Sequence, residues 1–260
     1  MIAALAMYDF GPAIGANDRF WALVRDDLRA QGIAAPEALT RGDAAYWPAW
    51  ESPDLLLSQT CGYPYRARLH DKVTLLGTPD YGLPGCPPGH YRSVYVVRRD
   101  DPRRTLSDFD GAGFAYNEDL SQSGWAGPQI HAASLGLRLH PVVQSGAHRL
   151  SARAVAEGRA DIAAIDALTL EMMRGFDPVV AELREIGFTD PPTPGLPWIT
   201  AKGRDPAPIL AALTQAVPRL SPQDRATLRL NGVVPIATDT YLAMPNPPTP
   251  AELSLMQAAS

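Results

Sequence analysis

The feature that most constrains this chain is a strand-like run that leads into a serine-rich helix start. Residues 113–116 have β character, the sequence Ser121-Gln122-Ser123-Gly124 follows, and a helix is expected over about 124–135. A helix N-terminus presents unpaired backbone N–H groups and the positive end of the helix dipole. Serines there either cap the helix or donate hydroxyls to an anion. The segment therefore predicts an ordinary N-cap or a site for a phosphate-like group.

Short apolar runs recur along the chain and alternate with helical patterns. Strands are expected at 2–7, 54–59, 73–77, 141–144 and 161–166. This alternation is typical of an α/β fold with a mostly parallel sheet. Ligands of such sheets bind at the carboxyl ends of the strands. The polar residues that end some of these runs are therefore candidates for a site.

Composition excludes several classes of function. The 260 residues carry a net charge of −5, so no general basic field is present to hold nucleic acid. No apolar run is long enough to span a membrane, and residues 1–7 lack the basic start of a signal peptide. The chain is therefore expected to be cytoplasmic, or to have lost an export signal. Its cysteines, Cys61 and Cys86, form one disulfide or stay as thiols, without the spacing of a zinc site.

An ordered set of motifs over 55–201 resembles a known family. The motifs are Thr60-Cys61-Gly62-Tyr63, 91–98, Leu106-Ser107-Asp108-Phe109, Ser121-Gln122-Ser123-Gly124, Ser145-Gly146-Ala147-His148 and the helix–strand pattern at 154–166. In their order and spacing they are similar to the substrate-binding proteins of phosphate, phosphite and phosphonate ABC transporters. That family has the two-lobed, type II periplasmic-binding-protein fold, in which each lobe is a sheet flanked by helices.

The resemblance implies a division of the chain. One lobe would hold residues 1–91 and 194–260, and the other residues 98–190. Segments 92–97 and 191–201 would be the crossovers, which act as a hinge when the lobes close on a ligand in the cleft between them. The family is exported, so the resemblance places the protein in the periplasm, with a membrane component of the transporter as its partner.

The resemblance also assigns binding residues. The oxygens of a small phosphonate- or phosphate-like solute would be held by Ser121, Gln122, Ser123, Gly124 and His148. Gln122 stands where the family more often has a small hydroxyl residue, which narrows or redirects the pocket.

Further residues would complete the pocket. Asp166 stands at an acidic or polar position of the family, and it would suit a ligand that also carries an ammonium group. On the other lobe, Tyr63, Thr60, Tyr8 and Tyr46 are candidates. Each of these residues also has a purely structural interpretation: Asp166 as a cap, and the tyrosines as packing residues.

The expected protein is therefore a monomeric binding protein without catalytic residues, cofactor or metal, and it acts in a transporter or as a soluble sensor. Two alternatives stay open. An enzyme on the same fold, acting on a small phosphorylated or carboxylated metabolite, would need His148 and Asp166 as a pair. A pyrimidine-like heterocycle would stack on Tyr63 or Trp125. A nucleophilic Cys61 has no supporting signature.

Overall fold

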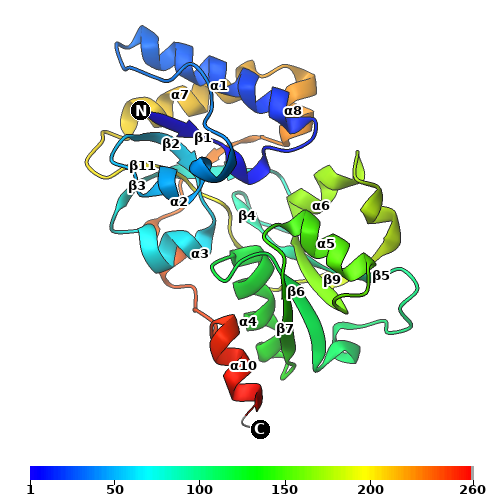
Figure 1. Ribbon diagram of the computed structural model, residues 1–260. Coiled ribbons are helices and arrows are strands. Elements are labelled where there is room, and N and C mark those ends of the chain that lie inside the picture. The colour runs from blue at the N-terminus through cyan, green and yellow to red at the C-terminus, as the bar shows by residue number, and fades with distance from the viewer. Residues whose placement is uncertain (259–260) are drawn as a thin grey trace. The chain divides into compact units, whose positions relative to one another are not determined.

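A computed structural model describes residues 1–258, which form two compact units (Figure 1). Unit 1 comprises Met1–His90 and Pro194–Ala243, and unit 2 comprises Tyr91–Thr193 and the segment from Met244 onward. The C-terminal segment was expected in the same lobe as residues 194–243. It belongs instead to unit 2, because its helix packs on a strand of that unit.

Unit 1 is built on a five-stranded sheet in the order β1-β2-β11-β3-β12. The strands are β1 (Ile2–Ala4), β2 (Leu55–Gln59), β3 (Val73–Asp80), β11 (Trp198–Ala201) and β12 (Gly232–Val234). Only the β1–β2 pair is parallel, since β11 runs antiparallel between β2 and β3, and β12 antiparallel to β3. The sheet is therefore mixed rather than mostly parallel, because the chain returns from unit 2 through its centre.

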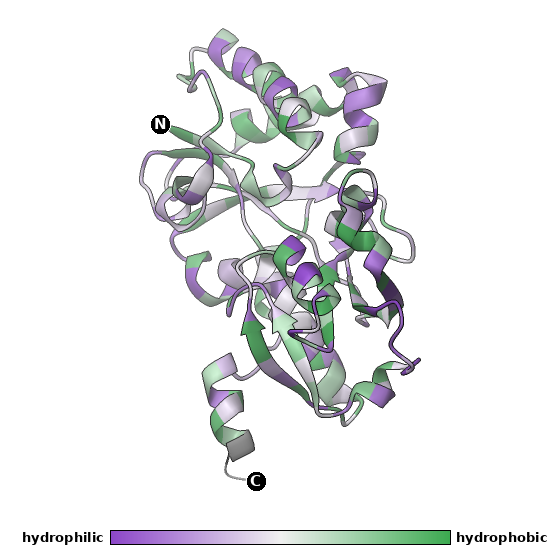
Figure 2. Ribbon diagram, turned by 45° about the vertical axis from the view of Figure 1, so that its right-hand side comes forward, coloured by the Kyte–Doolittle hydropathy of each residue, from purple (hydrophilic) through white to green (hydrophobic). Residues whose placement is uncertain are grey.

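Helices cover this sheet. They are α1 (Ala13–Ala30), α2 (Trp47–Trp50), α3 (Gly62–Pro64), α7 (Ala207–Ala216), α8 (Pro222–Leu228) and α9 (Thr238–Leu242). The longest, α1, buries one face through Phe20, Trp21, Val24 and Leu28, and it packs against α7 and α8. Figure 2 shows the hydrophilic and hydrophobic residues alternating along these helices, as one-sided burial requires.

The start of α1 differs from the prediction. The sequence pattern predicts a helix over about 19–31 that Asn17 or Asp18 caps and Gly32 ends, but α1 begins at Ala13. Asn17 lies inside the helix, and its buried side-chain amide donates to the Tyr8 carbonyl and to Asp9 Oδ1 at 3.4 and 3.0 Å. Asn17 therefore serves a tertiary contact, although its polar side chain resembles a helix cap in the sequence. The end was predicted correctly: Gly32, at φ 77°, follows the helix.

Unit 2 has a second five-stranded sheet, in the order β7-β6-β8-β5-β9. The strands are β5 (Ser93–Arg98), β6 (Ala112–Tyr116), β7 (Leu139–Gln144), β8 (Ile162–Asp166) and β9 (Leu183–Phe188). The β7, β6 and β8 strands are parallel, whereas β5 and β9 add antiparallel pairs. The helices are α4 (Gly127–Ser134), α5 (His148–Ala156), α6 (Ala167–Arg174) and α10 (Pro250–Ala258).

The segments expected as crossovers lie mostly inside the sheets. Residues 93–97 fall in β5 and residues 198–201 form β11, each a strand with neighbours on both sides. Where the chain passes between the units, β4 (His90–Tyr91) pairs with β10 (Thr193–Pro194). Hinge motion at segments 92–97 and 191–201 stays a prediction.

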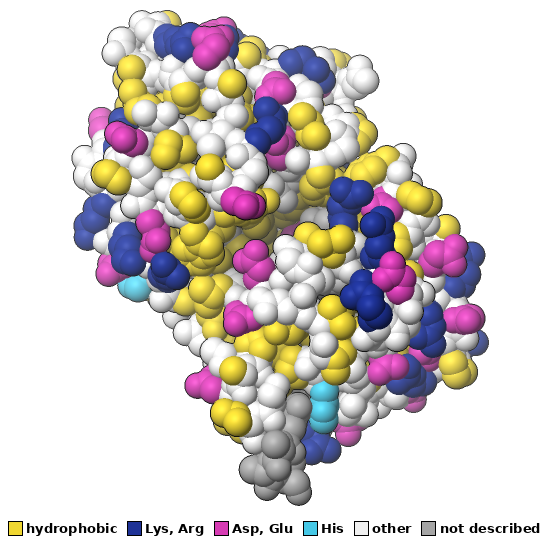
Figure 3. Space-filling view, viewed as in Figure 1, with side chains coloured by type: hydrophobic (Ala, Val, Ile, Leu, Met, Phe, Trp, Pro, Cys, Tyr) yellow, Lys and Arg dark blue, Asp and Glu magenta, His cyan; other side chains and the backbone are white. Residues whose placement is uncertain are grey.

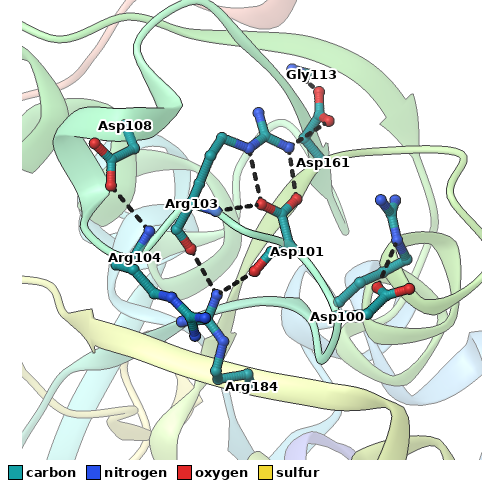
Figure 4. Close-up of polar contacts among 9 residues, drawn as sticks. Asp100, Asp101, Arg103, Arg104, Asp108, Gly113, Asp161 and Arg184 are labelled. Carbon is teal, nitrogen blue, oxygen red and sulfur yellow. Dashed lines mark hydrogen bonds and ion pairs between the residues drawn. The ribbon is translucent and has the colours of Figure 1, made fainter.

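An ion cluster fastens the loop after β5 to the rest of unit 2 (Figure 4). The Arg103 guanidinium binds the buried Asp101 carboxylate at 2.7 Å and Asp161 at 2.8 Å. Asp161 also accepts the Gly113 N–H of β6 at 2.9 Å. Arg184 of β9 donates to the backbone carbonyls of Asp101 and Arg103. Ion pairs and hydrogen bonds thus connect this loop to β6, to β9 and to Asp161, the residue before β8.

The surface carries charges of both signs. On the face shown in Figure 3, basic and acidic side chains are interspersed, which agrees with the small net charge of −5. Of the helices that the structure describes, none is both long enough and apolar enough to cross a bilayer.

Candidate functional site

The sequence-predicted anion site lies at one edge of the unit 2 sheet. Because β6, β7 and β8 are parallel, their carboxyl ends meet at the same edge. The loop after β7 is held there by hydrogen bonds from Ser145 N to Tyr116 O at 2.8 Å and from Gly146 N to Asn117 O at 2.9 Å. Ser93, which begins β5, pairs with Asp166 at the end of β8. Four strands therefore supply the residues of this edge.

The Ser121-Gln122-Ser123-Gly124 turn begins a π-helical segment, η5 (Gln122–Ala126), which continues into α4. Ser121 is the N-cap, and its Oγ accepts the Gly124 N–H at 2.9 Å. The Ser121 hydroxyl can still donate its own proton, since a hydroxyl has one donor and two acceptor positions. The cap and the anion-binding interpretations are thus compatible at this residue.

Gly124 is required by close packing rather than by its φ angle. A Cβ at this position would lie 1.8 Å from Asn117 Oδ1 and 3.2 Å from Ser121 Oγ. Asn117 Oδ1 is itself buried and has no hydrogen-bond partner among residues 1–258. The Asn117 side chain therefore occupies the space that a side chain at position 124 would need, directly beneath the serine turn.

Ser123 connects the turn to His148. Its Oγ lies 2.7 Å from His148 Nε2, and its backbone carbonyl accepts the Ser93 hydroxyl at 2.8 Å. His148 is the first residue of α5. Burial lowers the pKa of His148 to about 4, although the Ala164 carbonyl acts in the opposite direction. At neutral pH the imidazole is therefore uncharged, and it acts on the turn through its hydrogen bond.

Gln122 does not extend beyond the turn. It is buried, and its Nε2 lies 3.6 Å from the position that a Gly127 Cβ would take, within the same helix start. Its side chain thus packs along the helical segment, so Gln122 can serve an anion through its backbone N–H group.

Asp166 is buried at the end of β8 and caps α6, where its Oδ1 accepts the Thr169 N–H at 2.9 Å. Through Ser93 it is a close neighbour of the serine turn, because Ser93 pairs with Asp166 and binds Ser123. The structural role predicted for Asp166 is confirmed. Its role toward a ligand stays a prediction.

The site lacks cationic side chains of its own. Residues 117–127 include no Lys or Arg. Arg149, next to His148, binds Asp177 at 2.9 Å and lies over the Phe176 ring. Burial, together with Asp119, raises the pKa of Glu118. An anion at this edge would be held by hydroxyls, backbone N–H groups and the helix dipole.

The candidate binding residues of unit 1 do not lie together at one place. Tyr8 lines a cavity of about 20 Å³ together with Asn17, Phe20, Gln59, Tyr81 and Trp198. A volume of this size holds about one water molecule. The Tyr81 and Tyr8 rings meet in a T-shaped arrangement with their centroids 5.2 Å apart, and the Tyr81 hydroxyl accepts from Gln59 Nε2 at 2.9 Å. Of the sequence-predicted residues in this unit, only Tyr8 faces this cavity.

The other unit 1 candidates have structural surroundings. Tyr63 is buried, with the Arg66 guanidinium 4.3 Å from its ring centre. Tyr46 is exposed, and its hydroxyl donates to the Ala6 carbonyl at 3.3 Å. Thr60 is fully buried after β2, and its Oγ1 has no partner among the described residues.

Several residues at the serine turn of unit 2 and at the Tyr8 cavity of unit 1 were not predicted from the sequence. Ser93 and Asn117 reach the serine turn through strand pairing and close packing, for which no local motif exists. Gln59 and Tyr81 meet only because β2 and β3 flank β11. The one usable signal was that Gln59 stands at the polar end of an apolar strand.

No group of three or more His, Cys, Asp or Glu side chains in the described part of the chain is arranged to hold a metal ion. Both cysteines are present as thiols, Cys61 buried and Cys86 half-buried.

Solved structures share this fold. The methylphosphonate complex of PhnD1 from Prochlorococcus marinus has a TM-score of 0.71 at 16% identity, with 100% of this chain and 98% of that chain covered. The binding-protein component of an ABC phosphonate transporter from Pseudomonas aeruginosa has a TM-score of 0.68 at 15% identity, covering 99% and 86%. A Xanthomonas citri protein bound to ATP has a TM-score of 0.68 at 18% identity, covering 99% and 95%.

A comparison with curated proteins found no match. The sequence model described as "ABC transporter, phosphonate, periplasmic substrate-binding protein" matches residues 53–241, which is most of the chain. Members of this family bind a small phosphonate and work with the membrane components of a transporter. The chain belongs to this family of periplasmic substrate-binding proteins of phosphonate ABC transporters.

Proposed function

We propose that this chain binds a small phosphonate or a related tetrahedral oxyanion at the Ser121–Gly124 turn of unit 2, as a binding protein and not as an enzyme. The observation that carries the proposal is the position of this turn. It combines a helix start, two serine hydroxyls and an uncharged His148 at the carboxyl edge of three parallel strands. Such an edge supplies many neutral donors at once.

The roles follow from the geometry. Ser121 and Ser123 donate hydroxyl protons to ligand oxygens. The backbone N–H groups of Gln122 and Ser123 add further donors, since they lie at the N-terminus of the helix, where its dipole is positive. Asn117 and Gly124 keep the turn in shape. Specificity comes from satisfying these donors together, because a ligand without matching oxygens would leave buried donors unpaired.

The rival functions receive less support. His148 faces Ser123 and Asp166 caps α6, so each residue of the dyad that an enzyme would need is already committed elsewhere. Trp125 is fully buried, and its Nε1 donates to the Pro248 carbonyl at 3.1 Å. Tyr63 is buried with Arg66 over its ring. Neither ring is open for a heterocycle to stack on it.

A thermal-shift panel tests the proposal, with methylphosphonate, phosphate, sulfate, acetate and uracil as probes. A ligand at 100 times its Kd adds about 2.7 kcal/mol, which corresponds to roughly 5–10 °C for a chain of this size. We expect shifts with phosphorus oxyanions only, and their loss in Ser121→Ala/Ser123→Ala. Ser134→Ala is the matched control, since its hydroxyl lies on α4 but donates only to the His131 carbonyl. Shifts with acetate or uracil alone would overturn the proposal.

A variant of Asp166 distinguishes phosphonates that carry an ammonium group from those that do not. The Asp166→Asn variant keeps an oxygen that can accept the Thr169 N–H but loses the negative charge. If the natural ligand carries an ammonium group, this variant should bind 2-aminoethylphosphonate at least tenfold more weakly and methylphosphonate equally well. Equal losses for both ligands would assign Asp166 a structural role only.

A further inference from the structure

We propose that His148 and Ser123 form a proton-coupled subsite, so that the protein binds its oxyanion together with one proton, which is taken up by the imidazole. The inference rests on the proposed function, since it concerns the same turn. It starts from the short contact between Ser123 Oγ and His148 Nε2, at 2.7 Å.

The first step concerns the single proton of the Ser123 hydroxyl. At 2.7 Å the contact is a hydrogen bond in either direction. If the Ser123 hydroxyl donates to Nε2, its only proton is used in that hydrogen bond. An anion that approaches then meets only the lone pairs of the hydroxyl oxygen. If Nε2–H donates to the hydroxyl, the hydroxyl proton is available for the anion. Anion binding at Ser123 therefore requires a proton on Nε2.

The second step concerns the other ring nitrogen. Nδ1 of His148 is buried, and no acceptor among residues 1–258 lies in good hydrogen-bond geometry with it. A weaker hydrogen-bond contact with the Ala164 carbonyl of β8 nevertheless favours the protonated form of the ring, against the larger effect of burial. Because Nε2 is engaged with Ser123, this carbonyl favours a proton on Nδ1. A neutral ring carries one proton only, so the free protein holds it on Nδ1 and accepts the Ser123 proton at Nε2.

The third step joins the two. A neutral ring that moved its proton to Nε2 would direct the Nδ1 lone pair toward a carbonyl oxygen in a buried place, which is unfavourable. The imidazolium satisfies both sides: Nδ1–H faces Ala164, Nε2–H donates to Ser123, and Ser123 donates to the anion. The negative charge of the ligand also stabilises this cation, in a segment, 117–127, that has no Lys or Arg.

The other charged groups near α5 do not replace the positive charge of the His148 imidazolium. The ionisable side chains on the strands and the turn packed against α5 are Tyr95 and Arg98 on β5, Tyr116 on β6, His140 on β7, Asp166 on β8, Arg184 and Glu185 on β9, and Asp177 and Glu182 at η6 (Pro178–Glu182). The α5 helix itself adds Arg149 and Arg153, and η5 adds none. Of the carboxylates, Asp166 caps α6, Asp177 binds Arg149, and Glu185 pairs with Arg174.

Imidazole ¹⁵N NMR tests the proposal directly, because ring nitrogens with and without protons have well-separated shifts. Spectra at pH 6 are recorded for the wild-type chain with and without saturating methylphosphonate, and the His148 signals are identified by their loss in His148→Gln. We expect a neutral ring protonated on Nδ1 in the free protein and an imidazolium in the complex. A ring that stays neutral in the complex would overturn the proposal.

Calorimetry gives an independent measurement. Titrations at pH 6 in buffers of different ionisation enthalpy count the protons taken up, and the ligand contributes equally in the wild type and in His148→Gln, whose amide can donate to Ser123 without titrating. We expect the wild type to take up close to one proton more than the variant. Equal uptake overturns the proton coupling but leaves the proposed function standing. Absence of binding to any oxyanion by the folded wild type overturns both.

Discussion

Replacing Arg103 by Met should destabilise unit 2, because it removes the cationic partner of a buried carboxylate. The Asp101 carboxylate is only 2% exposed, and it accepts hydrogen bonds from Arg103 at N, Nε and Nη2, at 2.9, 3.0 and 2.7 Å. In Arg103→Met the backbone bond remains, while the guanidinium bonds to Asp101 and to Asp161 are lost. The contact of the guanidinium with the Phe109 ring, at 4.0 Å, is lost as well.

The magnitude follows from burial. Breaking one side of a fully buried ion pair costs about 3–5 kcal/mol. The Arg103 side chain is 31% exposed, so water can partly replace it, and we expect about 2–3 kcal/mol. This loss corresponds to a fall in Tm of roughly 4–10 °C. Arg104→Met is the matched control: it removes the same charge from the neighbouring exposed residue and should change the free energy of unfolding by less than about 0.5 kcal/mol.

Calorimetric unfolding at several pH values provides the assay. The hydrogen bonds of Arg103 lower the pKa of Asp101, so the folded state favours the carboxylate. The stabilisation is complete above the ordinary Asp pKa of about 4 and is lost as the pH falls through the lower folded pKa. The difference between the wild type and Arg103→Met should therefore be largest near pH 7 and shrink below pH 4. Equal Tm values for the two arginine variants at pH 7, or a difference unchanged at pH 3, would refute the reasoning.

Three further outcomes are expected. Gly124→Ala places a Cβ 1.8 Å from Asn117 Oδ1, so calorimetric titration should show at least a tenfold loss of methylphosphonate affinity, whereas Gly175→Ala, with its nearest atom at 3.5 Å, should bind normally. Tyr241→Phe removes a buried hydroxyl that contacts Thr78 Oγ1 at 2.6 Å and the Gly195 carbonyl at 3.0 Å; urea unfolding should report a loss of about 1–2 kcal/mol, and an unchanged midpoint would count against this. Because burial lowers the pKa of His148 to about 4, the wild type should lose up to roughly 3 kcal/mol as the pH falls from 6.5 to 4, and His148→Gln should lose distinctly less in the same unfolding series.

Local chemistry made part of this molecule predictable. Ser121, Ser123 and His148 were expected to lie close together because capping serines and a residue that begins a helix leave short patterns, and the structure does place Ser123 against His148. The family was found in the same way, from the order of several weak motifs. The sequence did not show that the Gln122 side chain lies along its own helix, since that depends on the packing around Gly127.

Long-range pairing made the rest unpredictable. The expectation of mostly parallel sheets failed at β11 and β5, because each of these strands enters its sheet from a distant part of the chain. The residue pattern of an apolar strand does not determine whether it runs parallel or antiparallel to its neighbours. The same cause hid Ser93, which reaches the site through strand pairing, whereas Asn117 was missed because its side chain reaches the turn by close packing against Gly124. The start of α1 was misplaced because a tertiary contact, not a cap, explains the polar Asn17.

The absence of Lys and Arg from segment 117–127 agrees with the uncharged state of His148. A fixed cation attracts any anion, and it does so whether or not the ligand has the right shape. Neutral donors act only where a ligand oxygen lies in line with them, so a turn that binds as proposed would discriminate by geometry. If His148 becomes charged only when its Ser123 partner turns toward a ligand, the positive charge arises only when a matching oxyanion is already in place. Such an arrangement combines the selectivity of neutral donors with the affinity of a cation.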